Sequence, residues 1–347
     1  TVFELASKLT LDSSEYKKGL KGSAKTANDF AKKLDKGLDK VLKVGSVAAG
    51  AAVAGMTAFA RSAVQTGMQF DSAMSQVAAT MGLTVDEIGE LRDFAQQMGA
   101  NTAFSATQAA EALNYMALAG YDTQKSMDML PTVLDLAAAG GMDLARASDM
   151  VTDAQSALGL SMDETTAMVD QMAMASSKSN TSVEQLGEAF LTIGATARSV
   201  KGGTTELATI LGVLADNGIK GSEGGTHLRN MILSLQSPTK EASALLDQMN
   251  VSLYDDEGNM RSLIDVIGDL QTGMEGMDQA SKDAVIGGIF NKTDLAAVNA
   301  LIGTSSERFD QLTEYIENAS GAATQMANTQ LDNLAGSFTL LGSSWDA

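Results

Sequence analysis

The sequence contains no cysteine among its 347 residues, two prolines and one histidine, His227. Without cysteine the chain has no disulfide, no thiolate metal site and no cysteine nucleophile. With a single histidine most routes to a zinc site are closed, and a Ser/His/Asp triad would have to use His227 as its base. No segment brings together a nucleophile, a base and an orienting group. We therefore predict no metal, no cofactor and no enzymatic activity.

Aromatic residues make up only 5% of the chain, whereas it holds 33 glycines and 20 methionines. Abundant Ala, Leu and Met with little aromatic content favour helices over a sheet-based core. We predict a mainly all-α fold, a compact multi-helix domain. Alternating apolar residues around an acidic turn in "VSLYDDEGNMRSL" predict one small β-hairpin near residues 251–262.

Helix starts are marked by the Ser/Thr-x-x-Glu/Gln spacing of a capping box, in which the first side chain accepts a hydrogen bond from a free backbone N–H. Five such pairs occur, at Thr84/Glu87, Ser105/Gln108, Ser161/Glu164, Ser182/Gln185 and Thr304/Glu307. Glycines such as Gly140, Gly159 and Gly218 follow apolar-periodic stretches and predict helix ends. The body is therefore predicted to be a succession of short helices.

Positive charge is concentrated at the N-terminal end. Residues 1–43 hold ten Lys against six acids, whereas the whole chain has a net charge of −19. After a short predicted strand at 2–11, residues 28–43 have the apolar spacing of a basic amphipathic helix. The acidic body disfavours nucleic-acid binding, which needs cations on the contact face. We predict an N-terminal part, residues 1–64, and a helical domain, residues 65–345.

The window "KVGSVAAGAAVAGMTAFARSA" (43–63) has no charged residue between Lys43 and Arg61. Seventeen residues are at the lower end of what a bilayer crossing needs, and Ala and Gly make the window only moderately hydrophobic. A transmembrane helix and a buried or self-associating helix fit it equally. The candidate membrane-interacting residues are Lys43, Val44, Val47, Val53, Met56, Phe59 and Arg61.

Two segments resemble ligand sites but have simpler explanations. The Gly-rich stretch "KGSEGGTHLRNM" (220–231) lacks the Gly-Lys-Ser/Thr ending of a P-loop, which favours a glycine-rich helix start over a phosphate site. The Met-rich runs at 127–130 and 168–175 are adaptable binding faces or core filler, and we favour core filler.

An internal repeat is predicted by aligning residues 105–158 with 182–235, an offset of 77. Ten of the 54 pairs are identical, among them Ser105/Ser182 and Gly141/Gly218. The alternative is that two capped Ala/Leu-rich helices align by composition alone.

Several blocks beyond residue 70 resemble the core region of phage tail tape measure proteins. The blocks are "FDSAMSQVAATMG" (70–82), "ALAGYDTQKSMDMLPTVLDLAAAGGMDLARASD" (117–149), "SNTSVEQLGEAF" (179–190), "LADNGIKGSEGGTHLRNMILSL" (214–235), "LYDDEGNMRSLIDVIGDL" (253–270) and "VIGGIF" (285–290). The resemblance covers most of residues 65–345. It implies a multi-copy structural protein of the virion tail that sets tail-tube length during assembly in the host cytoplasm and leaves at infection to help the genome cross the host envelope.

The same resemblance implies partners: the tail tube protein, tail assembly chaperones, tail tip or baseplate hub proteins, further copies of the chain and the host membrane. A ruler measures by extended helix length, yet glycines interrupt this body repeatedly. We therefore expect the measuring part to lie outside these residues, and the chain to be a piece of a longer protein without a signal peptide. The alternative function is a membrane-perforating translocator that acts through residues 43–63.

Overall fold

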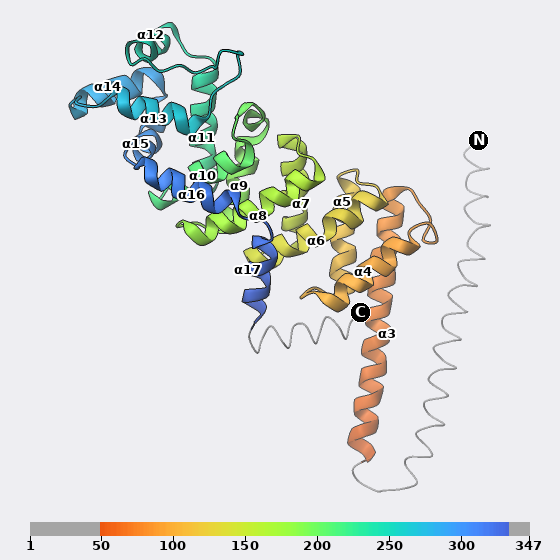
Figure 1. Cartoon of the computed structure of the whole chain (residues 1–347). Helices are drawn as coiled ribbons and strands as arrows, with labels where there is room; N and C mark the ends of the chain where they lie inside the picture. Colours follow the sequence, from red (N-terminus) through yellow and green to blue (C-terminus); the bar gives the residue numbers. More distant parts are fainter. Residues whose placement is uncertain (1–48, 333–347) are drawn as a thin grey trace, which may run out of the picture. The chain divides into compact units, whose positions relative to one another are not determined.

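The computed structural model describes the backbone of residues 49–332 and the side chains of residues 65–332 (Figure 1). Contacts divide the chain into two units, Thr1–Thr66 and Gly67–Ala347. Every regular element in the described backbone is a helix, which confirms the prediction of a mainly all-α fold. The predicted strand at 2–11 and basic helix at 28–43 lie outside the described residues.

The helices follow one another as α3 (Ala49–Met81), α4 (Gly89–Asn101), α5 (Ala106–Leu118), α6 (Thr123–Gly140), α7 (Leu144–Leu158), α8 (Met162–Lys178), α9 (Val183–Ile193), η1 (Gly194–Ser199), α10 (Gly203–Asp216), α11 (Gly221–Gln236), α12 (Lys240–Gln248), α13 (Leu263–Gly273), α14 (Gln279–Ile289), η2 (Lys292–Asp294), α15 (Leu295–Ile302), α16 (Ser306–Glu317) and α17 (Ala322–Leu331).

Helices α4 to α11 form four successive hairpins that stack side by side (Figure 1). The second helices of the hairpins, α5, α7, α9 and α11, pack each against the next, and the first helices, α4, α6, α8 and α10, do the same in a second layer. The residues that precede the second helices are Ser105, Asp143, Ser182 and Lys220, at intervals of 38, 39 and 38. Regular stacking of helix pairs is the arrangement of α-solenoids.

The predicted repeat of 77 residues equals two of these intervals. Helices α5 and α7 begin 77 residues before α9 and α11, and α6 begins 80 residues before α10. We propose that the repeat 105–158/182–235 arises from this stacking, with its offset of 77 residues corresponding to two successive hairpins of 38 or 39 residues.

Local side-chain chemistry sets several of the helix boundaries. Capping boxes form at Ser105, Ser161 and Ser182, where each hydroxyl accepts a hydrogen bond from the backbone N–H three residues later. Gly141 and Gly159 end α6 and α7 in the left-handed conformation that glycine adopts without steric cost.

Two predicted capping boxes are wrong. The Glu87 carboxylate does accept hydrogen bonds from the backbone N–H and hydroxyl of Thr84, but these bonds close a turn that precedes α4. Thr304 donates its hydroxyl back to the Ala300 carbonyl at 2.8 Å, and α16 begins after Ser305 instead. After Thr84 the helix begins only at Gly89, and after Thr304 it begins one residue later than the spacing predicts.

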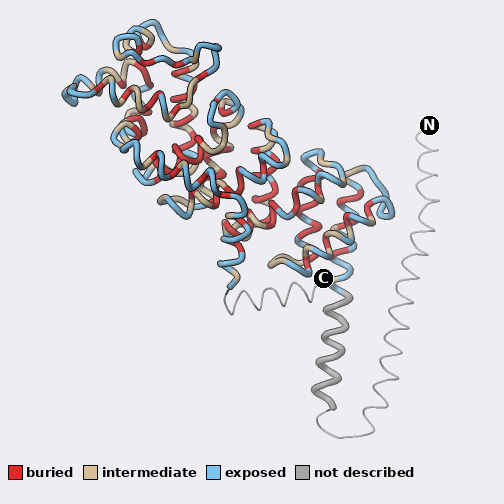
Figure 2. Tube along the Cα trace, viewed as in Figure 1, coloured by how far each residue is buried: buried red, intermediate tan, exposed pale blue. Residues whose placement is uncertain are grey.

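Apolar side chains from most of the helices form one core. Figure 2 marks the buried residues in red along these helices. Met168 and Met172 of the second Met-rich run are fully buried, as is Met129 of the first. These three methionines therefore fill the core, as we predicted.

The predicted β-hairpin does not form, and residues 49–332 contain no strand. A single antiparallel bridge pairs Tyr254 with Met260 across a tight turn. Inside the turn the Asp255 carboxylate accepts hydrogen bonds from the backbone N–H groups of Glu257 and Asn259. The alternating side chains Leu253 and Met260 are buried among helices, and an isolated two-stranded ribbon is marginal without such support.

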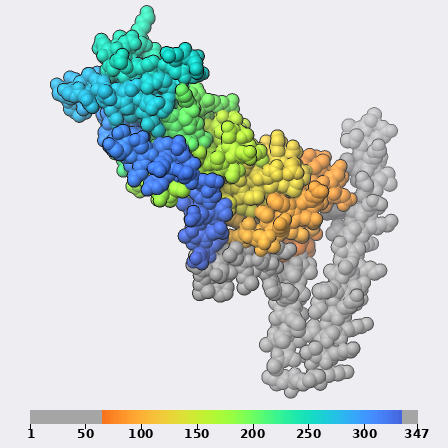
Figure 3. Space-filling model, in the orientation of Figure 1, coloured from red at the N-terminus to blue at the C-terminus, as the bar shows by residue number. Residues whose placement is uncertain are grey.

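The last helices run back along the layer of first helices. Helix α16 packs on α10 and α8, and α17 packs on α8 and α6, so the chain passes the stack in the reverse order (Figure 3). Helices α12 to α15 lie between these two passes in the sequence, and α15 contacts both α10 and α11.

Candidate functional site

Three carboxylates are buried in the described structure, and each binds a segment distant in sequence. Asp170, Glu206 and Asp294 have exposed fractions of 8%, 3% and 0%. Burying a carboxylate is costly unless hydrogen bonds or an opposite charge compensate for lost water. The partners of these three groups therefore identify places where segments distant in the sequence are held together.

Asp170 of α8 caps the N-terminus of α17. Its two oxygens accept hydrogen bonds from the backbone N–H groups of Gly321, at 2.8 Å, and Ala323, at 3.0 Å. These N–H groups have no partner within their own helix, and the positive end of the helix dipole favours the negative charge. Asp170 is thus a cap supplied from 151 residues away.

Asp135 of α6 lies beside this cap and accepts a hydrogen bond from the Thr324 hydroxyl. Burial raises the pKa of Asp135, the hydrogen bond from Thr324 lowers it, and the nearby charge of Asp170 raises it, with a net upward direction. At the other end of α17, the Gln330 amide donates to the Ala139 carbonyl at 2.7 Å.

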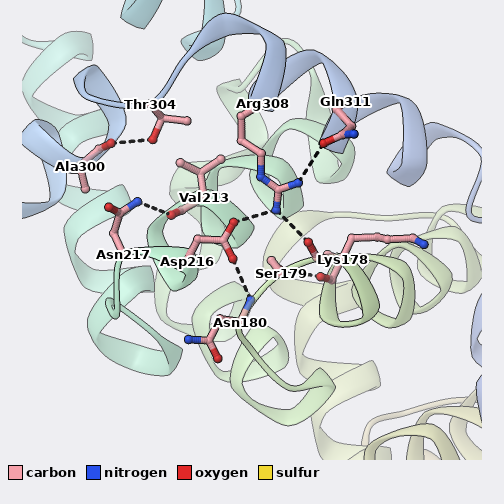
Figure 4. Close-up of polar contacts among 11 residues, drawn as sticks. Lys178, Ser179, Asn180, Val213, Asp216, Asn217, Ala300, Thr304, Arg308 and Gln311 are labelled. Atoms are coloured by element: carbon pink, nitrogen blue, oxygen red, sulfur yellow. Dashed lines mark hydrogen bonds and ion pairs between the residues drawn. The ribbon is translucent and has the colours of Figure 1, made fainter.

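Helix α16 is fastened by an arginine that joins the ends of α8 and α10 (Figure 4). The Arg308 guanidinium donates to the Asp216 carboxylate at 2.7 Å and to the Lys178 carbonyl at 2.8 Å. The other oxygen of Asp216 accepts from the Asn180 backbone N–H at 2.8 Å. Arg308 and Asp216 thereby satisfy two backbone groups between α8 and α9 and connect them to the end of α10.

Glu206 of α10 holds the start of α13. Its carboxylate accepts from the Ser262 hydroxyl at 2.5 Å and from the Ile264 backbone N–H at 3.0 Å, while its second oxygen accepts from the Gly202 N–H at 3.1 Å. Three donors compensate for the burial of this charge.

Asp294 of η2 contacts the only histidine of the chain. One carboxylate oxygen lies 2.7 Å from His227 Nδ1 and accepts from the Asn230 side-chain amide at 3.2 Å, both on α11. His227 is thus a half-buried link between α11 and η2, and no geometry here presents it as a base to a substrate.

Comparison with known proteins identifies the family of this chain. Residues 92–291, which are 200 of the 347, match the family described as phage-related minor tail protein. The chain belongs to this family. It is 32% identical to the "Tape measure protein" of Pneumococcus phage Dp-1 over 99% of this chain and 30% of that protein. It is 28% identical to the "Probable tape measure protein" of Escherichia phage P2 over 88% of this chain and 38% of that protein.

The chain therefore spans well under half the length of these two relatives. No solved structure matches it.

In this minor tail protein the Gly-rich segment 220–231 serves helix packing. Helix α11 begins at Gly221, and a Cβ placed on Gly225 would lie 2.5 Å from the Ala189 carbonyl oxygen of α9. The glycine thus allows the backbones of α9 and α11 to approach closely. The sequence likewise favoured a glycine-rich helix start over a phosphate site.

The seven predicted membrane-interacting residues fall at the edge of the described chain. Lys43, Val44 and Val47 lie outside it, and the other four, Val53, Met56, Phe59 and Arg61, lie on α3 before the first described side chain. Within residues 49–332 no helix has both the length and the hydropathy that crossing a bilayer requires.

Sequence reasoning missed the three buried carboxylates. Two of them had a signal in the sequence: Asp170 stands in the Met-rich run "MVDQMAMA", and Glu206 precedes the apolar run "LATILGVL". An acid on the apolar face of a helix indicates a buried partner, but the sequence does not say which one. In the described part of the protein no three His, Asp or Glu side chains gather as a metal site would require.

Proposed function

We propose that this chain is the folded part of a phage tail tape measure protein, which sets the length of the tail tube and assists its assembly. The observation that carries the proposal is the similarity to the Dp-1 "Tape measure protein" along 99% of this chain. The arrangement of the site supports it, since the buried acids and Arg308 bind the chain's own backbone and side chains. Such groups stabilise a scaffold.

The length of the tail is measured outside this folded part. A helical ruler gains about 1.5 Å per residue only where it runs on in one direction. Here helices of 13 to 18 residues, such as α4 and α6, fold back on their neighbours, so added residues do not add length in proportion. We assign to residues 65–332 a role in nucleating or closing the tube with its partners.

In-frame deletions in the full-length gene test both statements. Deletions in a rod-like helical tract outside this chain should shorten tails in electron micrographs by about 1.5 Å for each residue removed. Removing the α8/α9 hairpin, Met162–Ile193, should instead abolish tail assembly, because the neighbouring hairpins lose their packing partner. Unchanged tail length in the first series would contradict the tape measure role. Proportionate shortening in the second would contradict the division of labour.

The proposal includes the partners and the later role that the family resemblance implies: tube protein, assembly chaperones, hub proteins, further copies, and help in genome delivery at the host envelope. We further propose that residues 43–63 meet lipid only after release. The lack of charge between Lys43 and Arg61 supports this, as do the ten lysines of residues 1–43, which would attract an anionic leaflet.

Vesicles of mixed neutral and anionic lipid provide the test. The chain should bind them and release a trapped dye, and deletion of residues 44–60 should remove the release. A chain that leaves every vesicle composition intact would contradict this part of the proposal and leave the structural role standing.

A further inference from the structure

Helix α17 rests on α8 and α6 with little apolar contact (Figure 1). Its buried residues are Ala323 and Ala327, each with a single methyl group, and Met326 is half-buried beside them. Helix α16, which precedes it on the return path, buries three larger side chains, Phe309, Leu312 and Ile316. Because apolar stabilisation scales with the area removed from water, α17 gains much less from its contact than α16 does.

Polar contacts hold α17 at both ends. At its start, Asp170 of α8 accepts hydrogen bonds from the backbone N–H groups of Gly321 and Ala323. At its end, the Ala139 carbonyl of α6 accepts a hydrogen bond from the Gln330 side chain at 2.7 Å. Helix α17 has no side-chain cap of its own, because glycine occupies its N-cap position. The helix therefore depends on a cap that another helix supplies.

Two of the acceptors that face α17 are carboxylates. Asp170 is buried, and Asp135, which accepts a hydrogen bond from the Thr324 hydroxyl, is half-buried. Keeping both carboxylates under α17 costs hydration, and their like charges repel each other. When α17 moves away, water reaches both groups again. The contact thus combines weak apolar attraction with a cost that opening removes.

The chain also has a hinge at the start of α17. Gly321 joins the return helices α16 and α17 and has a φ of 77°, in the left-handed region that glycine adopts without steric cost. Helix α16 is held separately, because Arg308 donates hydrogen bonds to Asp216 and to the Lys178 carbonyl. Movement of α17 about Gly321 therefore leaves the attachment of α16 in place.

We propose that α17 is a strap that opens from α6 and α8 about Gly321 while the hairpin stack and α16 stay folded. Opening uncovers a face of α6 and α8 that offers hydrogen-bond acceptors, among them Asp135, Asp170 and the Ala139 carbonyl. The inference does not depend on the tape measure role, because it concerns only how one helix is held to its neighbours.

The absence of cysteine provides the assay, since an introduced thiol is the only one in the chain. Ala327→Cys places a thiol on the buried face of α17, and Ala112→Cys places one in α5, where the native side chain is fully buried. With a thiol reagent in excess, position 327 should react at least about tenfold faster than position 112, because local opening needs less free energy than global unfolding. Low urea should hardly change the rate at 327, because opening a strap exposes little surface.

Asp170→Ala removes the cap of α17 and should speed the reaction at position 327 about tenfold, which is the size expected for a lost N-cap. The matched control is Asp143→Ala, which removes a carboxylate cap from α7 and should leave the rate at 327 unchanged. Circular dichroism checks that each variant keeps its helices. If Asp170→Ala loses helix content, Gln330→Ala tests the contact at the other end and should speed the reaction severalfold.

Equal rates at positions 327 and 112 would overturn the proposal, because α17 would then open only when the whole body unfolds. A rate at 327 that neither Asp170→Ala nor Gln330→Ala changes would also overturn it. So would a rate that Asp143→Ala raises as much as Asp170→Ala does, since α17 would then share its opening with the hairpin stack.

Discussion

Gly225 provides the sharpest test of the hairpin stack, because it lies where α11 crosses α9. A Cβ added there would meet the Ala189 carbonyl oxygen at 2.5 Å, the Ala189 Cα at 2.8 Å and the Thr192 Cβ at 2.9 Å. Two of these atoms belong to the backbone of α9 and cannot rotate away. Gly225→Ala should therefore force the two helices apart along a buried contact.

The magnitude follows from two opposing terms. Overpacking a buried contact costs about 1–3 kcal/mol, and we expect the upper end because backbone atoms are involved. Replacing glycine by alanine inside a helix returns about 1 kcal/mol. The net loss in free energy of unfolding should be about 2 kcal/mol. In a domain of about 150–250 residues, a loss of this size lowers the melting temperature by about 4–8 °C.

The matched control is Gly268→Ala in α13. Gly268 also lies inside a helix, and a Cβ there meets nothing within 4 Å. This variant should gain about 1 kcal/mol from helix propensity alone. Denaturant unfolding followed by far-ultraviolet circular dichroism measures both variants. If Gly225→Ala proves as stable as Gly268→Ala, the close approach of α9 and α11 is refuted.

Three further predictions concern the polar side chains that hold distant segments together. Glu206→Ala leaves three donors without their acceptor and should lower the free energy of unfolding by about 3 kcal/mol, with Glu206→Gln costing less because it keeps an acceptor oxygen; denaturant titration ranks the two. Arg308→Met removes partly exposed hydrogen bonds to Asp216 and to the Lys178 carbonyl and should cost only about 1 kcal/mol in the same titration. Because the pKa of Asp135 is raised in the folded protein, its charged form opposes folding at neutral pH, and this cost disappears as pH falls through the folded pKa to below the ordinary value of 3.8. Asp135→Asn should therefore raise the melting temperature at neutral pH, and the gain should vanish in acid; a gain that is constant with pH would contradict the assignment.

Features that depend on a few neighbouring residues could be predicted from the sequence. The capping boxes at Ser105, Ser161 and Ser182 formed where their spacing indicated, because a hydroxyl and a backbone N–H three residues away meet within one helical turn. The all-α class followed in the same way from composition and apolar spacing. The failed hairpin near 251–262 shows the limit of such patterns, since alternating apolar residues were buried by helices instead of by a neighbouring strand.

The tertiary structure alone decided which distant groups meet. Nothing near Asp170 in the sequence predicts that it binds the backbone of Gly321, 151 residues later, at the start of a helix, or that Gly225 must face Ala189. The repeat could be detected at an offset of 77, but the shorter interval of 38 or 39 between hairpins became visible only in the helix positions. Helix formation is governed by local hydrogen bonds and can therefore be predicted from short stretches of sequence. Stacking is governed by contacts between faces that only the folded chain brings together.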